Sequence, residues 1–364
     1  MLNRPGAVEG TGPDAGVAWH YGDPSGEQRA LAARAAVADA SHTGVVTVTG
    51  PDRLTWLHSI TSQHLADLAP RTSTETLVLS PHGHVEHAAG VVDDGTTTWL
   101  LTSDAAALAG WLDSMRFMTR VEVADVTGQW AAVGEPVDAE GTGAEPVTWR
   151  DPWPRTLPGG TRYGPVDDRH PGAERPWRLV LVPRGDLDAA VTEREAAGWR
   201  LVGTWATEAA RVAAWRPRAA TDVDHRTIPH ELDWLRTAVH MAKGCYRGQE
   251  TIARVHNLGR PPRRLVMLHL DGSGHLLPEP GADVTAAGRT VGTVTSLARH
   301  HELGPVALAV VKRNVDPAAA LLVACDGGDV AAAQEVVVPA EGVSVDRPAP
   351  RGPVARGLTP RTGP

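Results

Sequence analysis

Residues 45 to 126 contain short apolar runs typical of strands, separated by segments in which the apolar residues have helical spacing. The β-branched run 45–49 predicts a strand, and Leu54, Leu57 and Ile60 after Gly50-Pro51-Asp52 have the spacing of one helix face. Further along we expect strands at 75–80, 85–92, 97–102 and 121–126 and a helix at 104–118. The two strands around Pro81–His84 form a predicted hairpin. This order is typical of helices on one face of a mostly antiparallel sheet.

The flanking segments predict a second, less regular α+β half. A weak apolar stripe predicts a helix over 27–40, with Ser25 as its N-cap. Residues 134–176 are rich in Gly, Pro and acids, and we interpret them as a long connection with at most one strand. Beyond it we expect strands at 178–182 and 199–204 and helices at 186–197 and 207–215.

The pattern changes again after residue 264. Apolar runs at 265–270, 291–296, 306–311 and 321–325 are short and are separated by Gly and Pro, which predicts a small β-barrel. Past residue 338 the chain has Pro, Gly and Arg without periodicity, and we expect a disordered tail over 339–364.

Composition narrows the functional classes. The formal net charge of -8 argues against nucleic acid as a partner. Two cysteines exclude a disulfide framework and favour a reducing, cytoplasmic location. No run of 18 apolar residues occurs, so we expect no membrane association. Residues 243–264 are locally basic, with six basic residues and one acid, which fits either a small-anion site or a solvated loop.

One stretch, 243–251, combines a thiol, an amide, an aromatic ring and two glycines. Lys243 and Arg247 would favour the thiolate form of Cys245, and the glycines permit close approach of a ligand. Cys245 is therefore either a reactive residue or a buried cysteine beside a glycine turn. His82, His84 and His87 lie close together, but strand alternation separates them, so we interpret them as turn or cleft residues and expect no metal. Neither a P-loop nor a dinucleotide fingerprint is present.

The stretch Lys-Gly-Cys-Tyr-Arg-Gly-Gln-Glu closely resembles the signature of the YgfZ family, folate-binding relatives of the glycine-cleavage T-protein (aminomethyltransferase). Other segments agree in the same order along the chain: 46–54, 79–85, the Pro-His-Glu run 229–231 and Gly-Thr-Val-Thr-Ser at 292–296. The resemblance covers about residues 17 to 338.

The resemblance implies an α+β fold with a T-protein-like folate-binding region in two α+β halves, followed by a C-terminal β-barrel. The expected domains are 17–127, 128–262 with the signature loop, and 263–338, before the tail at 339–364. It also implies tetrahydrofolate, or a one-carbon derivative of it, in a central opening. By the same resemblance Cys245 is the catalytic or working residue, and the cofactor-binding residues are Lys243, Tyr246, Gln249, Glu250 and Arg254.

Two departures from the T-protein pattern bear on mechanism. His87-Ala88 stands where the T-protein has an acidic pair, and Arg211-Val212-Ala213 stands where it has Arg-Leu-Glu. General acid–base help for aminomethyl transfer is then missing, unless His87 acts as a base. We therefore do not expect T-protein-type aminomethyl transfer.

Three functions remain open at this point. The resemblance favours a tetrahydrofolate-binding accessory protein that supports iron–sulfur cluster assembly or repair, with folate and iron–sulfur client or assembly proteins as partners. The alternative is a folate-dependent aminomethyl or methyl transferase. A binding or scaffold module without a ligand is the third.

Overall fold

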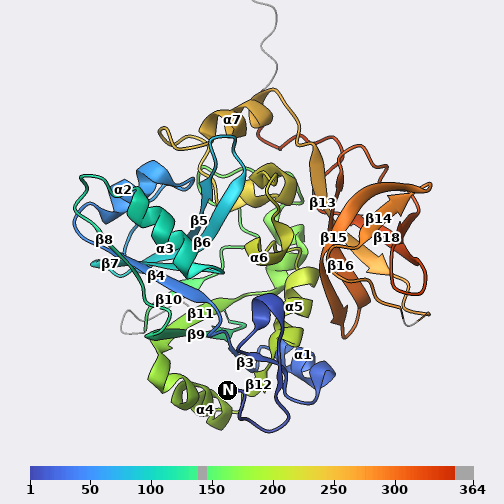
Figure 1. Cartoon of the computed structure of the whole chain (residues 1–364), viewed down its shortest axis with the longest axis horizontal. Coiled ribbons are helices and arrows are strands. Elements are labelled where there is room, and N and C mark those ends of the chain that lie inside the picture. The colour runs from blue at the N-terminus through green and yellow to red at the C-terminus, as the bar shows by residue number, and fades with distance from the viewer. Residues whose placement is uncertain (138–145, 275, 349–364) are drawn as a thin grey trace, which may run out of the picture.

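The computed structural model describes residues 1–137, 146–274 and 276–348. Two five-stranded sheets and a closed six-stranded barrel make up these residues, with a two-stranded pair of β1 (Val8–Glu9) and β2 (Ala18–His20) near the N-terminus. In Figure 1 the barrel, orange to red, stands beside the two sheets and their helices. The expected α+β region followed by a C-terminal barrel is confirmed.

The first sheet is antiparallel, as predicted, and the two predicted helices pack on it. Its strands run in the order β5 (Ser73–Leu79), β6 (Val85–Asp93), β7 (Thr97–Thr102), β4 (Gly44–Thr49) and β8 (Glu122–Asp125). Helices α2 (Arg53–Ile60) and α3 (Ala105–Ser114) cover it (Figure 1). Leu57, Leu108 and Leu112 from these helices are buried against alternate residues of the sheet.

The second sheet corrects the N-terminal helix prediction. Its order is β10 (Thr148–Arg150), β11 (Arg178–Pro183), β9 (Trp130–Glu135), β3 (Ala36–Asp39) and β12 (Arg200–Val202). Helix α1 is only Pro24–Ala32, and Asp23, not Ser25, caps it. The alanines of 36–39 favour a helix locally, but this segment is fully buried as a strand between β9 and β12. Tertiary pairing therefore overrides propensity here.

The long connection predicted over 134–176 agrees with the structure, because its described residues beyond Glu135 contain one strand, β10. Strand β9 begins at Trp130 and continues to Glu135, pairing with both β11 and β3. The part of this segment at 138–145 lies outside the described residues. Helices α4 (Leu187–Ala196), α5 (Thr204–Ala213) and α6 (Ala219–Asp222) follow, close to the expected positions of the first two. The predicted domain boundaries themselves stay a prediction.

Six antiparallel pairings close the barrel. Its strands are β13 (Arg263–Leu270), β16 (Gly304–Lys312), β15 (Arg289–His300), β14 (Asp283–Ala286), β17 (Leu321–Val323) and β18 (Val330–Val336), and β18 returns to β13. Strand β18 was not predicted, because Val-Ala-Ala-Ala has little β propensity.

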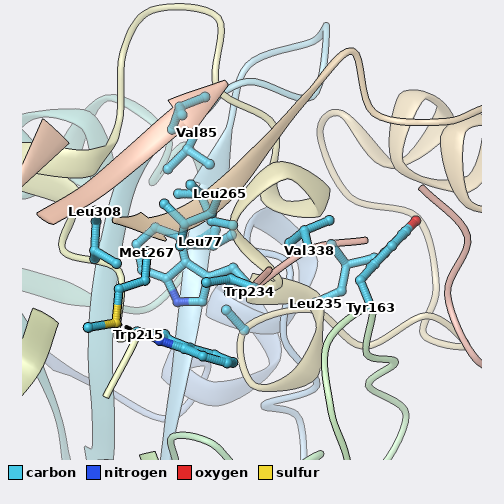
Figure 2. Close-up of a cluster of buried hydrophobic side chains, with 14 of the residues drawn as sticks. Leu77, Val85, Tyr163, Trp215, Trp234, Leu235, Leu265, Met267, Leu308 and Val338 are labelled. Atoms are coloured by element: carbon cyan, nitrogen blue, oxygen red, sulfur yellow. Dashed lines mark hydrogen bonds between the residues drawn. The ribbon is translucent and has the colours of Figure 1, made fainter. Parts of the chain in front are cut away.

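One core cluster joins the barrel to the α+β region. In Figure 2 Trp215 and Trp234 lie against Met267 and Leu308 of the barrel and Leu77 of the first sheet. The indole N–H of Trp215 donates to the Met267 sulfur at 3.0 Å. Because side chains from all three parts share this cluster, the barrel packs as part of the same core and not as a tethered domain.

The first ten residues of the predicted tail, 339–348, are ordered. Residues 339–348 return to the molecule: Ser344 is buried against His256 (Oγ to Nδ1 3.1 Å), and the Val345 N–H donates to the Arg162 carbonyl. The prediction of disorder is wrong for 339–348, because contacts with the rest of the protein hold this stretch although its sequence has no hydrophobic periodicity. Residues 349–364 lie outside the described residues. No helix in the described parts of the chain is long and apolar enough to span a membrane.

The fully buried ion pair of Arg236 and Asp233 allows its contribution to stability to be tested. The Arg236 guanidinium donates to Asp233 at 2.5 and 2.9 Å and to the carbonyls of Pro154 and Pro165, and neither charged side chain is exposed. Arg236→Met would leave the Asp233 carboxylate buried without a counter-charge. We expect the free energy of unfolding to fall by about 3–5 kcal/mol in denaturant titration. The exposed Arg289→Met should change it by less than about 0.5 kcal/mol, and equal stabilities for both variants would contradict this account.

Candidate functional site

The loop 243–248, which begins the signature stretch and is called the signature loop below, lies against the β5–β6 hairpin. It leads into helix α7 (Gln249–Asn257), at the top of Figure 1. Gly248, at the N-cap of this helix, has φ +84°. A Cβ there would lie 2.5 Å from the Ser80 carbonyl oxygen. Only glycine fits this close approach, so the loop and the hairpin are held at a fixed distance.

Lys243 fastens the start of the loop to the end of α2. Its ammonium donates to the carbonyl oxygens of His58, Thr61 (2.6 Å) and Gln63 (2.9 Å), and it lies 5.0 Å from the ring centre of Tyr246. Burial lowers the pKa of Lys243 to about 7. Three carbonyl acceptors match the three N–H bonds of the ammonium, so the amine already has its partners within the protein.

The other predicted site residues have different exposures. The Cys245 thiol is exposed, as are the side chains of Glu250 and Arg254. Tyr246 is buried, which raises the pKa of its phenol. Gln249 donates its side-chain amide to the Lys243 carbonyl at 3.3 Å. Of the two interpretations of Cys245, the buried one is therefore wrong, while the ligand-binding roles of the five neighbouring residues stay a prediction.

The basic segment 243–264 does not form one cationic surface. Arg247 pairs with Glu86 at 2.8 Å, and Arg263 pairs with Asp224 and Glu231. Arg264 is fully buried, donating to the Val315 carbonyl and to Gln334. Four of the six basic residues, Lys243, Arg247, Arg263 and Arg264, thus have partners within the protein, while Arg254 and Arg260 are exposed.

A cavity of about 550 Å³ lies between the two sheets, away from the signature loop. Its aromatic walls are Trp149, Trp177 and Trp234. Its charged lining residues are Asp14, Asp39, His42, Glu75, Asp104, Asp151, Arg175, Glu208, Arg211, Arg216 and Arg218. None of residues 243–251, all of them described, lines it. The structure therefore separates the cavity from the exposed thiol.

Arg216 binds two buried carboxylates that line the cavity. Its two terminal nitrogens donate to both oxygens of Glu75 on β5 (3.1 and 2.8 Å), and its Nε donates to Asp151, just after β10, at 3.2 Å. All three side chains are less than a tenth exposed. One guanidinium thus connects a strand of the first sheet to the edge of the second.

A second network ties the cavity to the barrel. Arg211 on α5 donates to Glu208, to Asp222 and to Ser296 of β15, and Arg218 donates to Asp14. Burial acts to raise the pKa of Glu208, but Arg211 and Arg218 outweigh it and hold that pKa at about 2. Glu208 is therefore an ionised structural partner at neutral pH and has no proton to donate.

Sequence reasoning missed the histidine that lines the cavity. His42 sits in the turn after β3, with its Nε2 3.6 Å from Asp14 Oδ1. Burial, with help from Arg218, lowers the pKa of His42, so its ring is neutral at pH 7. His42 follows the segment 36–41, and nothing local in the sequence distinguishes it from the other histidines.

His87 cannot serve as the base of this cavity. On β6 the side chains alternate, so Ala88 lines the cavity while His87 points among Leu57, Leu100 and Leu108 on the opposite face. Burial there lowers the pKa of His87. His82 and His84 lie in the exposed hairpin turn with ring centres 6.2 Å apart. Within the described residues, no three His, Cys, Asp or Glu side chains are placed to hold a metal.

Comparison with known proteins gives the same architecture. Residues 16–134 match the GCVT N-terminal domain, and residues 263–343 match the glycine cleavage T-protein C-terminal barrel domain. The chain therefore has a T-protein-like fold. The glycine cleavage system aminomethyltransferase T from Bartonella henselae superimposes with a TM-score of 0.73, covering 93% of this chain and 94% of that one at 18% identity.

Two curated proteins are related in sequence to this T-protein-like chain. A putative chloroplastic transferase from Arabidopsis thaliana is 24% identical over 71% of this chain, and the match spans only 61% of that protein. An aminomethyltransferase from Moorella thermoacetica is 27% identical over 75% of this chain and 77% of its own length. These relatives support the GCVT-like part of the expected resemblance, and the narrower YgfZ assignment stays a prediction.

Removing the Lys243 amine separates a structural role from a ligand-binding one. Lys243→Met leaves three carbonyls without their donor, so we expect the free energy of unfolding to fall by about 2–4 kcal/mol in denaturant titration. Arg254→Met, at an exposed position of the same region, is the control and should change it little. A Lys243→Met protein as stable as the wild type that has lost folate binding would instead make Lys243 a ligand residue.

Proposed function

We propose that this chain is a cytoplasmic tetrahydrofolate-binding protein of the YgfZ type that supports the assembly or repair of iron–sulfur clusters in client proteins. Tetrahydrofolate, or a one-carbon derivative, occupies the cavity between the sheets, and Cys245 is the working residue. The observation that carries the proposal is that a chain with a T-protein-like fold has a cavity lined by Ala88 and an exposed thiol outside that cavity.

The cavity suits a folate in size and chemistry. Its volume of about 550 Å³ is within the range of small-molecule sites, and Trp149, Trp177 and Trp234 offer apolar walls for flat rings. Asp39 and Asp104 line it as carboxylates that can accept hydrogen bonds from a ligand's amino groups. Most of the other charges are paired with each other, so the cavity is polar without being strongly charged.

The position of Cys245 suits work on a partner protein. The loop that bears it is held on both sides, by the Lys243 contacts with α2 and by the close approach of Gly248 to the hairpin. Its thiol is nevertheless exposed, so a protein surface can reach it without opening the fold. A fixed, accessible thiol fits transient contact with sulfur, iron or a client cysteine better than it fits chemistry on a ligand bound between the sheets, because Cys245 does not line that cavity.

A folate-dependent aminomethyl or methyl transferase is the second candidate. Its support is that both curated relatives are named as transferases and that Asp39, Asp104 and His42 line the cavity as ionisable groups. Against it, Ala88 and Ala213 stand where the T-protein resemblance expects carboxylates. Turnover of tetrahydrofolate with an aminomethylated or methylated donor would identify this activity in the purified protein.

Filling the cavity should block folate binding. Ala88→Leu adds a larger side chain at a lining position, so we expect tetrahydrofolate affinity to fall by about tenfold or more, measured by titration of tryptophan fluorescence. Ala333→Leu, at an exposed position on β18, should bind as the wild type does. Unchanged affinity in Ala88→Leu, with wild-type thermal stability, would place the ligand elsewhere.

Loss of the thiol should abolish cluster support without affecting the cavity. In a strain lacking this gene, we expect Cys245→Ser to fail to restore the activity of iron–sulfur enzymes, while its tetrahydrofolate affinity stays within about twofold of wild type because Cys245 does not line the cavity. Cys325→Ser, in the barrel, is the matched control and should restore activity. Full restoration by Cys245→Ser would remove the role given to this thiol.

A further inference from the structure

The four arginines that line the cavity differ in how many of their donors are used. Arg211 directs all three of its nitrogens at acceptors: Glu208, Asp222, the Arg216 carbonyl and Ser296. Arg216 likewise uses all three of its nitrogens on Glu75 and Asp151. These two guanidiniums serve the fold and have little left to offer a ligand.

Arg218 uses both of its terminal nitrogens, on Asp14 and on the Pro13 carbonyl. Arg175 uses fewer of its donors than the other three arginines. Among the described residues, its side chain makes one hydrogen bond, from a terminal nitrogen to Asp151 Oδ2 at 3.2 Å, and this carboxylate already accepts from Arg216. Its Nε is buried and has no acceptor within the described residues. The guanidinium carbon lies 5.2 Å from the ring centre of Trp177, which holds the group in place at the cavity wall.

A buried N–H without an acceptor is unfavourable, and the cost is recovered if a ligand supplies the missing oxygen. A carboxylate is the partner that a guanidinium binds best, because two parallel N–H bonds can meet its two oxygens. Asp39 and Asp104 elsewhere in the cavity would repel a negatively charged group, so the anionic end of a ligand is driven toward Arg175.

The place of Arg175 suits the end of an elongated ligand. Together with Trp177 and Thr207 it borders both the central cavity and a second pocket of about 300 Å³, which is lined further by α1, α5 and the turn after β15. A ligand whose rings occupy the central cavity can therefore extend past this wall with its terminal group at the guanidinium.

We propose that Arg175 is the specificity-determining residue for the carboxylate end of the cavity ligand, and that the ligand lies with this end at the Arg175–Trp177 wall. The inference rests on the proposed function, because in a tetrahydrofolate that end is the glutamate moiety. It assigns to Arg175 an anion-binding role, which the sequence left open for the basic segment 243–264.

The test compares two ligands that differ only in the charge of the glutamate: tetrahydrofolate and its diamide, in which both glutamate carboxylates are replaced by neutral amides. By titration of tryptophan fluorescence, the wild type should bind tetrahydrofolate about tenfold or more tightly than the diamide. Arg175→Gln should bind the two equally, with its affinity for the diamide unchanged. Arg175→Lys, which keeps the charge but not the fork of donors, should retain part of the preference. Arg169→Gln, at an exposed position nearby, should behave as the wild type does.

The outcomes distinguish a failure of the role given to Arg175 from a failure of the proposed folate binding. If Arg175→Gln keeps the full preference, or weakens both ligands by the same factor, the role of Arg175 is overturned while folate binding stands. If the wild type binds neither ligand, the proposed function fails and the inference fails with it. Thermal melting of each variant, with and without the diamide, establishes that Arg175→Gln is folded and that its cavity is intact.

Discussion

The buried contact of Arg216 with Glu75 and Asp151 is the constraint on which the rest of this structure depends. Glu75 belongs to β5 of the first sheet, Asp151 follows β10 at the edge of the second, and Arg216 follows α5. Three charges with so little exposure are stable only if they satisfy one another. The two sheets must therefore meet at this point, and the space that remains between them is the cavity.

This origin explains the chemistry of the cavity. Its arginines and acids are first of all each other's partners, as the Arg211, Glu208 and Asp222 network to the barrel also shows. The groups that remain available to contact a ligand are three tryptophans, a few carboxylates, His42 and Arg175, whose Nε has no acceptor among the described residues. A ligand site of this kind recognises a molecule by matching a few leftover donors and acceptors, and not by net charge.

The sequence predicts the fold better than the site. Strands with β-branched residues, such as β4 and β6, are found where their pattern places them, whereas the alanine-rich β3 and β18 are strands only because neighbours pair with them. The cavity is harder still. Its charged residues come from Asp14, Glu75, Asp151 and the 208–218 segment, and no local pattern in a single sequence brings such distant positions together.

The signature stretch illustrates the same distinction within nine residues. Lys243, Tyr246 and Gly248 are fixed by the fold: the first bonds backbone carbonyls, the second is buried, and the third fits only without a side chain. The side chains of Cys245 and Glu250 are left exposed, with no comparable structural duty among the contacts described. A motif that looks like one ligand site is thus two sets of residues, one that shapes the loop and one that the loop presents. In the proposed function, the chemistry of the stretch belongs to the second set, at the thiol of Cys245.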